Sequence, residues 1–362
     1  MNFKSVSFDR KQHVNFSQTL KKRINDYFQE NKISRYANTQ MVFKGILMTS
    51  IYLVPYILLL SLKIENPWVV LLIYSIMGVG VAGIGLNIMH DANHGVFSRN
   101  KTINTLLSLS MNFVGSSASM WRIQHNVLHH TFTNIDGMDE DTESMPFLLR
   151  FTPNQKRRPI HKYQHLYAWF FYTLMTLARI LLTDFTKVFT YSKKGLIKTK
   201  KEFYMELSFM ILSKAIYFGY VILIPVLILP VSWWVPIVGF VLMHLIAGFI
   251  LAIIFQAAHI VPDAKFPVPN EGGEISEPWL VHELATTANF GTGNKTLTWL
   301  IGGLNFQVEH HLFSNISHVH YLQISKIVKE TTKEYGLPYI EAPTFWSALV
   351  QHARMLKQLG RA

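Results

Sequence analysis

The segment of this sequence with the clearest capacity for chemistry is 307–311, which reads QVEHH. On a helix, residues three and four positions apart share a face, so Gln307 would lie beside both His310 and His311. The two adjacent histidines would point about 100° apart, because one helical turn holds about 3.6 residues. One short segment can therefore supply ligands to two metal ions.

Two other segments also contain histidines at helical spacing. One reads HDANH and places His90 and His94 four positions apart; the other reads HNVLHH and places His125 four positions before the adjacent pair His129 and His130. A single histidine is more often a packed core or surface residue than a ligand. Three clusters at helical spacing instead predict a metal site, because imidazole is the commonest metal ligand among side chains.

The composition predicts a membrane protein. The chain has 362 residues, 49% of them hydrophobic, and the apolar residues are concentrated in long runs rather than spread over amphipathic elements. The net charge of +12 is typical of basic loops on the cytosolic side of a membrane, so we expect no nucleic acid partner. The lack of cysteine excludes disulfides, cysteine-ligated zinc and iron–sulfur clusters.

Four apolar runs are long enough to cross a lipid bilayer, at 42–62, 67–89, 209–229 and 233–256. We therefore expect an all-α integral membrane protein with four transmembrane helices in two hairpins, plus cytosolic and interfacial helices that carry a histidine-rich di-metal site. The basic segment 1–41 is expected to be a cytosolic amphipathic segment that rests on the membrane. A membrane domain at 42–340 and a cytosolic tail at 341–362 follow it.

A fifth run, 166–183, is also long enough to span. A crossing there would put QVEHH on the opposite side of the membrane from the other two clusters. Basic residues flank both ends of this run, so we expect it to lie on the cytosolic face, together with both termini and every histidine cluster. Lys214 is expected to extend its ammonium group to the same face.

Within the second run, Gly78, Gly80 and Gly83 match the dinucleotide-binding pattern G-x-G-x-x-G. That pattern needs a strand before it and a helix after it, and here it lies inside an apolar span. Small residues in a span more often let two helices approach closely.

The fourth run ends beside His259, which is therefore expected on the same side of the membrane as the three histidine clusters. The candidate ligands are His90, His94, His125, His129, His130, His259, Gln307, His310 and His311. This set exceeds what one four- to six-coordinate ion needs, so we expect two ions, and imidazole leaves iron, zinc and copper open. No glutamate is followed three residues later by histidine, so the set is not that of the carboxylate-rich four-helix di-iron proteins.

Other polar residues can support such ligands. Asp91 and Glu309 flank ligands, and His282 lies in VHELATTANF; each can orient an imidazole from behind. As exposed cytosolic carboxylates, Asp91 and Glu309 need no such role. The acidic stretch 136–143 is expected to be a solvated loop.

The segments HDANHGVF, HNVLHHTFTN and QVEHHLF, in this order and with this hairpin arrangement, resemble the three histidine boxes of the membrane fatty acid desaturases. The resemblance extends from about Pro67 to Tyr339 and makes 42–340 a desaturase domain. Gln307, where many relatives carry histidine, resembles the front-end branch (delta-5 and delta-6, linoleoyl-CoA desaturase-like). Those enzymes insert a double bond between an existing one and the carboxyl end.

The resemblance implies an oxidoreductase whose two iron ions use O2 and two electrons to place a cis double bond in a long-chain acyl group carried by CoA or a lipid. It implies that the boxes and His259 are the iron ligands, and it leaves open whether Gln307 binds iron directly or through water. Arg157 and Arg158 are candidates for the phosphates of the substrate head group; basic loops that merely follow the positive-inside rule are the alternative.

Many eukaryotic front-end members carry a fused haem domain with a His-Pro-Gly-Gly motif, which is absent here. We therefore expect a separate electron donor, a ferredoxin or a free cytochrome, and a location in a bacterial inner membrane. A lipid hydroxylase or ketolase on the same scaffold is one alternative. A membrane metal transporter or haem carrier is another, although a transporter would place ligands at mid-membrane, where only His244 lies.

Overall fold

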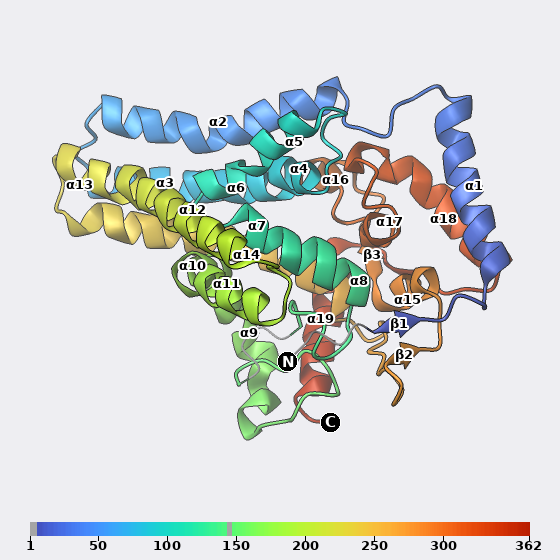
Figure 1. Cartoon of the computed structure of the whole chain (residues 1–362). Coiled ribbons are helices and arrows are strands. Elements are labelled where there is room, and N and C mark those ends of the chain that lie inside the picture. Colours follow the sequence, from blue (N-terminus) through green and yellow to red (C-terminus); the bar gives the residue numbers. More distant parts are fainter. Residues whose placement is uncertain (1–5, 143–146) are drawn as a thin grey trace. The chain divides into compact units, whose positions relative to one another are not determined.

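The computed structural model describes residues 6–142 and 147–362, which divide into two compact units (Figure 1). Residues 38–122 and 169–252 belong to the first unit, and 6–37, 123–142, 147–168 and 253–362 to the second. Helices dominate both units. The described residues also contain two parallel strand pairs, β1 (Ser7–Phe8) with β2 (Glu274–Ile275) and β3 (Ala288–Phe290) with β4 (Ile340–Ala342).

The first unit is built around the long apolar helices. Its elements are α2 (Thr39–Ser61), α3 (Pro67–Gly83), the π-helix η1 (Ile84–Met89), α4 (His90–Asn93), α5 (Lys101–Ser108), α6 (Ser110–Phe113), α7 (Ala118–Arg122), α10 (Met175–Ala178), the π-helix η4 (Arg179–Thr183), α11 (Asp184–Lys193), α12 (Lys200–Phe218), the π-helix η5 (Gly219–Leu223), α13 (Ile224–Ile228) and most of α14 (Trp234–His259).

Four helical stretches are long and apolar enough to cross a membrane, which confirms the four expected spans. They cover 39–61, 67–93, 200–228 and 234–259. The third starts nine residues earlier than expected (200 against 209), because Thr199 caps the helix through Glu202 N at 3.1 Å and the helix begins before the apolar run does. The pair Pro159–Thr173 and Met175–Lys193 also passes this test but is bent by 58°, as a broken span or a re-entrant loop would be.

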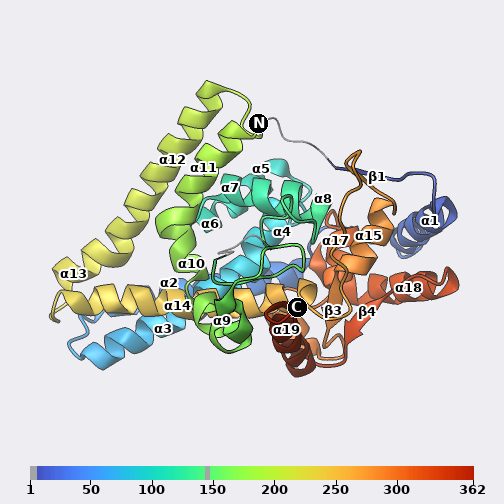
Figure 2. The same ribbon diagram turned by 90° about the horizontal axis from the view of Figure 1, so that it is seen from below.

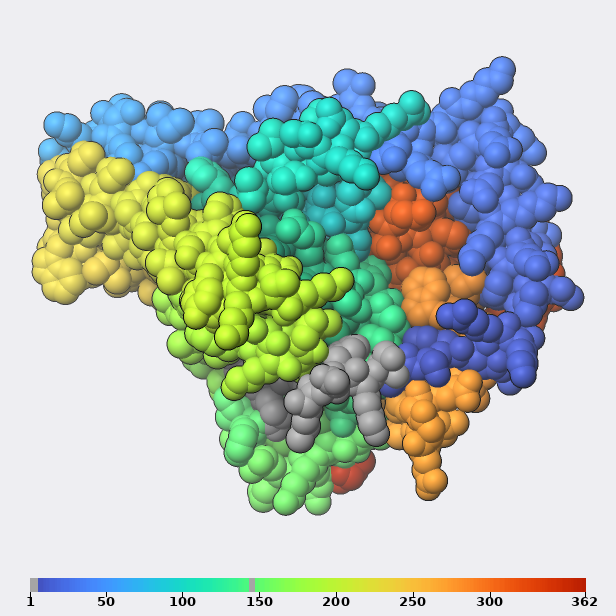
Figure 3. Space-filling model, viewed as in Figure 1, coloured from blue at the N-terminus to red at the C-terminus, as the bar shows by residue number. Residues whose placement is uncertain are grey.

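The third span, 200–228, exposes many large apolar side chains. It lies on the surface in Figure 3, where its atoms are coloured yellow-green to yellow. The exposed apolar residues include Phe209, Ile211, Leu212, Ile216, Leu223 and Leu227. A water-exposed surface of this composition would favour association, so these residues fit contact with acyl chains.

The glycines of α3 pack helices closely, as their place in an apolar span predicts. A Cβ on Gly78 would lie 2.5 Å from the Met243 backbone oxygen, and a Cβ on Gly80 would lie 2.6 Å from the Tyr52 backbone nitrogen. Main-chain atoms cannot move aside as a side chain can. The nucleotide interpretation of this pattern therefore has no place in the structure, because the segment is a helix packed against α2 and α14.

We predict that Gly80→Ala destabilises the first unit by about 1–3 kcal/mol, the usual cost of overpacking, despite the better helix propensity of alanine. Gly83→Ala is the matched control, because the three atoms nearest to its Cβ all belong to the movable Met48 side chain, with Sδ at 2.7 Å. Thermal unfolding in detergent measures both. Equal unfolding temperatures for the two variants would contradict the close approach at Gly80.

Lys214 does not extend to the membrane surface, contrary to our expectation. It is 3% exposed, and its Nζ donates to the backbone oxygens of Gly115 and Ile180 at 2.9 and 2.8 Å and to Asp184 Oδ2 at 2.9 Å. Helix α11, which begins at Asp184, lies beside α12 (Figure 2). The sequence placed Lys214 near the start of a span, but α12 begins at Lys200, so Lys214 lies well inside the span with Asp184 as its counter-ion.

The second unit carries most of the histidines. Its elements are α1 (Val14–Glu30), the π-helix η2 (Ile123–His129), α8 (His130–Phe132), the 3-10 helix η3 (Pro159–Tyr163), the start of α9 (Gln164–Thr173), the end of α14, α15 (Trp279–Thr286), α16 (Lys295–Leu300), α17 (Gln307–Leu312), the 3-10 helix η6 (His318–His320), α18 (Tyr321–Glu334) and α19 (Phe345–Leu359).

The N-terminal helix α1 is amphipathic, as expected, but its apolar face does not rest on a membrane. Phe16, Leu20 and Ile24 are buried in one cluster with residues of α18, and Arg23 forms an ion pair with Glu334 at 2.9 Å. Periodicity shows that a helix has an apolar face, but it does not show whether protein or lipid covers that face.

Candidate metal centre

His90 and His94 lie in the first unit, at the end of the second span. Their ring centroids are 4.8 Å apart, and each ring packs edge-on against Trp121, with centroid distances of 5.7 and 5.9 Å. His90 Nδ1 is 3.7 Å from Asp91 Oδ1. The π-helix η1 comes directly before this pair, and single-turn π segments often occur at functional sites.

The other box histidines and His259 lie in the second unit, and the π-helix η2 sets the direction of three of them. Its i→i+5 bonding gives about 4.4 residues per turn, or about 82° per residue. Residues four and five positions apart then share a face, so His129 and His130 both lie within about 50° of His125. In an α-helix, His130 would point about 140° away from His125.

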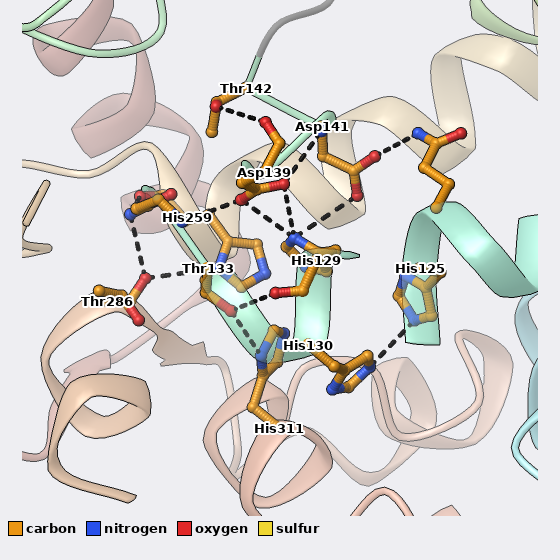
Figure 4. Close-up of polar contacts among 12 residues, drawn as sticks. His125, His129, His130, Thr133, Asp139, Asp141, Thr142, His259, Thr286 and His311 are labelled. Carbon is orange, nitrogen blue, oxygen red and sulfur yellow. Dashed lines mark hydrogen bonds and ion pairs between the residues drawn. The ribbon is translucent and has the colours of Figure 1, made fainter. Parts of the chain in front are cut away.

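One group of three, here called the first trio, consists of His129, His259 and His311 (Figure 4). Their ring centroids are 4.7, 4.8 and 4.9 Å apart, and one nitrogen from each ring lies within 4.8 Å of the others. All three side chains are buried. Three converging imidazoles from η2, α14 and α17 form a nearly equilateral set suited to a cation.

A second trio consists of His125, His130 and His310, which are also buried. Their Nε2 atoms are 3.2 Å (125 to 130), 2.9 Å (130 to 310) and 3.4 Å (310 to 125) apart. A neutral imidazole nitrogen has either one proton or one lone pair, so it can serve one hydrogen bond. A triangle of such nitrogens cannot be satisfied by hydrogen bonds among its own members.

A bound metal ion would satisfy the second trio, and the converging rings of the first trio could hold another. Two imidazole nitrogens that bind one ion at about 2.0–2.1 Å, with an angle of about 90–109°, are about 2.9–3.4 Å apart. The Nε2 distances of the second trio, 2.9 to 3.4 Å, fall in this range. The two neighbouring histidines of each of the last two boxes fall into different trios. His130 and His310 belong to the second trio, and His129 and His311 belong to the first. The donor sets therefore fit two ions.

A buried carboxylate holds the far side of His129 (Figure 4). Its Nδ1 lies 3.1 Å from Asp139 Oδ1 and 3.6 Å from Asp141 Oδ2. Burial of the His129 ring lowers its pKa, but the charges of Asp139 and Asp141 outweigh burial and raise that pKa to about 9. A carboxylate on Nδ1 fixes the tautomer and leaves Nε2 for a metal.

Asp139 corrects our expectation of a solvated acidic loop. It is 0% exposed, because its oxygens receive the backbone N–H groups of Asn134 and Asp141 at 2.9 and 3.0 Å in addition to His129. A run of acidic residues in a sequence does not reveal which carboxylate is buried. The two hydrogen bonds from the backbone and the imidazole together compensate its loss of water.

Two further candidate ligands also have an oxygen atom close to Nδ1. His310 Nδ1 is 3.1 Å from the Tyr321 hydroxyl, and His259 Nδ1 is 3.4 Å from the Thr286 backbone oxygen. Gln307 is 1% exposed, and its side chain lies close to His259. Its amide nitrogen makes no hydrogen bond of normal geometry within 6–142 and 147–362.

The residues that were expected to orient ligands differ in what they contact. Asp91 and Glu309 are both buried, contrary to their expected exposure. Glu309 accepts hydrogen bonds from Asn289 Nδ2 at 2.8 Å and the Tyr339 hydroxyl at 3.0 Å. Burial raises the pKa of Glu309 to about 7. The His282 ring lies against Phe8, with centroids 5.0 Å apart. The neighbouring Glu283, which the sequence did not single out, makes the contact with a ligand: its Oε2 is 2.8 Å from His311 Nδ1.

Arg157 and Arg158 lie away from these contacts. Arg157 is exposed, and the guanidinium of the half-buried Arg158 lies 3.9 Å above the Phe147 ring. Both precede η3, at the start of the basic flank of the bent helix pair. Their position is compatible with contact to phosphates or simply with a basic interfacial segment.

Comparison with known proteins extends these observations. Residues 66–343 match the family model described as fatty acid desaturase. The chain is 36% identical over 351 residues to an acyl-lipid (8-3)-desaturase of Physcomitrium patens, covering 96% of this chain and 72% of that protein. It is 33% identical over 350 residues to an sn-1 linoleoyl-lipid 6-desaturase of Synechocystis sp., covering 96% of each. It is 31% identical over 359 residues to an acyl-lipid (8-3)-desaturase of Mortierella alpina, covering 95% and 78%.

Proposed function

This chain belongs to the fatty acid desaturase family, and we propose that it is a front-end acyl-lipid desaturase that works through two iron ions. It is an oxidoreductase that introduces double bonds into acyl chains. The observation that best supports the proposed metal count is the separation of six buried histidines into two trios. The nitrogens of the first trio lie within 4.8 Å of one another, and the Nε2 atoms of the second are 2.9–3.4 Å apart. When bound, two iron ions with O2 and two electrons supply the oxidising power that removes two hydrogens from neighbouring methylenes.

We propose that the ligands are the two trios together with His90, His94 and Gln307. The four-residue spacing of His90 and His94 on α4 supports their assignment, and the burial of Gln307 beside His259 supports a role either as a direct ligand or through water. The protein's own contribution is to hold these nitrogens in fixed tautomers and to keep the site buried, which protects a strong oxidant from side reactions.

The proposed substrate is a long-chain acyl group on a membrane lipid, because the similar plant, cyanobacterial and fungal proteins are named for acyl-lipid substrates. The new double bond is proposed to lie on the carboxyl side of an existing one, which the names of these relatives and Gln307 in QVEHH support. Arg157 and Arg158 are proposed contacts for the lipid phosphate.

The proposed arrangement has four spans, with both termini and all histidine boxes on the cytosolic side, which the basic segment before the first span supports. The chain contains no cysteine and so no iron–sulfur cluster, and we propose that a separate ferredoxin or free cytochrome supplies the electrons. Location in a bacterial inner membrane remains a prediction.

Product analysis tests the proposal. The chain is expressed in a host with a compatible ferredoxin, oleate and linoleate are supplied, and the double bonds of the lipid acyl groups are located by mass spectrometry. We expect a product lighter by two hydrogens with the new double bond on the carboxyl side of the existing one. A new double bond on the methyl side would contradict the front-end assignment, and a product that has gained an oxygen atom would identify a hydroxylase.

A further inference from the structure

Helix α15 carries no proposed metal ligand, yet it contacts three segments that do. Trp279 Nε1 donates to the His130 backbone oxygen at 3.2 Å, and the Thr286 backbone oxygen faces His259 Nδ1 at 3.4 Å. Glu283, between them, reaches His311. One short helix therefore supports residues of both trios from behind.

Glu283 makes the most specific of these contacts. Its Oε2 is 2.8 Å from His311 Nδ1 and accepts the Thr133 hydroxyl at 2.9 Å, and the side chain is 0% exposed. Thr133 lies three residues after His130, so this one carboxylate oxygen joins the segment of the second box to a ligand of the third. The Thr133 hydroxyl oxygen also lies 2.8 Å from the His129 backbone oxygen, so its single proton can be directed to either acceptor.

Carboxylates lie behind two of the three imidazoles of the first trio. Three neutral imidazoles add no charge, so a buried divalent ion would leave two positive charges in a medium of low polarity. The fully buried carboxylates bonded to this trio are Asp139 on His129 and Glu283 on His311, while Asp141, 3.6 Å from His129 Nδ1, is partly exposed. Asp139 and Glu283 can therefore supply buried negative charge opposite such an ion.

We propose that Glu283 is a positioning residue of the metal centre: it directs His311 Nε2 toward the ion of the first trio and supplies negative charge that helps to compensate that ion. This inference rests on the proposed metal centre. It predicts a selective effect, because Glu283 contacts a ligand of the first trio and the proposed second ion is held by other histidines.

The test uses the full-length protein purified in detergent after growth with 57Fe. Mössbauer spectra count the two iron environments, and the rate of iron loss to a chelator measures retention. We expect Glu283→Gln to weaken retention of one of the two irons by about 10- to 100-fold, the usual effect of losing a ligand-supporting partner, and to leave the other iron unchanged. Glu283→Asp keeps the charge and is expected to restore part of the lost retention.

Glu309→Gln is the matched control. It removes a buried carboxylate from the QVEHH segment itself, but that carboxylate is bonded to Asn289 and Tyr339. We expect both irons to be retained in this variant. The proposal for Glu283 is overturned if Glu283→Gln keeps both irons as firmly as the wild type, or if it loses both equally, as general unfolding would cause. A wild-type protein without iron would instead overturn the proposed function.

Discussion

His129→Ala is expected to reduce the desaturated product by more than about 100-fold, because even residues that only support a ligand typically contribute 10- to 100-fold. His129 belongs to the first trio, its ring is buried, and Asp139 holds its Nδ1 at 3.1 Å. Alanine removes the nitrogen and also leaves Asp139 buried without its imidazole partner. The product fraction in lipid acyl groups, measured by mass spectrometry at equal protein level, reports the loss.

His165→Ala is the control for this prediction. His165 lies on α9, is half-buried, and belongs to neither trio. We expect its variant to form product at a level close to that of the wild type. If His129→Ala formed as much product as His165→Ala, the first trio would have no part in the reaction.

Lys214→Met is expected to destabilise the protein by about 3–5 kcal/mol, the usual effect of leaving one member of a buried ion pair without its partner. The substitution leaves the Asp184 carboxylate, 0% exposed, with the Ser117 N–H at 2.9 Å and the more distant Arg179 at 3.5 Å. It also leaves the Gly115 and Ile180 carbonyls without the ammonium group. Unfolding in detergent, followed by circular dichroism, measures the change.

A double-mutant cycle separates the ion pair from packing. Lys214→Met/Asp184→Leu removes both charges, and we expect it to be less destabilised than the sum of the two single variants. Each single variant leaves one charge of the pair buried without its partner, and the double variant leaves neither. Additive effects of the single substitutions would show that Lys214 and Asp184 do not interact energetically.

The spans were predictable from the sequence because hydropathy over about 20 residues is a local property. The runs at 67–89 and 233–256 correspond to helices at 67–93 and 234–259. The candidate ligands were also visible locally, since spacing of three to five residues needs only a helix. The closeness of Gly80 to α2 followed from the same local rule for small residues in spans.

What the sequence did not show depends on distant partners. Glu283 meets His311 28 residues later and Thr133 150 residues earlier, and no spacing rule links them. Asp139 was one of several acidic residues in a run until its backbone contacts were known. The expected surface position of Lys214 was wrong because Asp184, 30 residues away, neutralises it inside the unit. The π-helical register of η2 has no clear sequence signal, yet it turns His130 toward His125.

The most direct test of the metal centre is the iron content of the purified full-length protein, determined by elemental analysis beside a His310→Ala/His311→Ala variant. One histidine of this pair belongs to each trio, so the variant weakens both sites. We predict about two iron ions per chain in the wild type and a large loss in the variant. A wild-type chain with no bound iron, or a variant that retains both ions, would contradict the assignment of the two trios as iron sites.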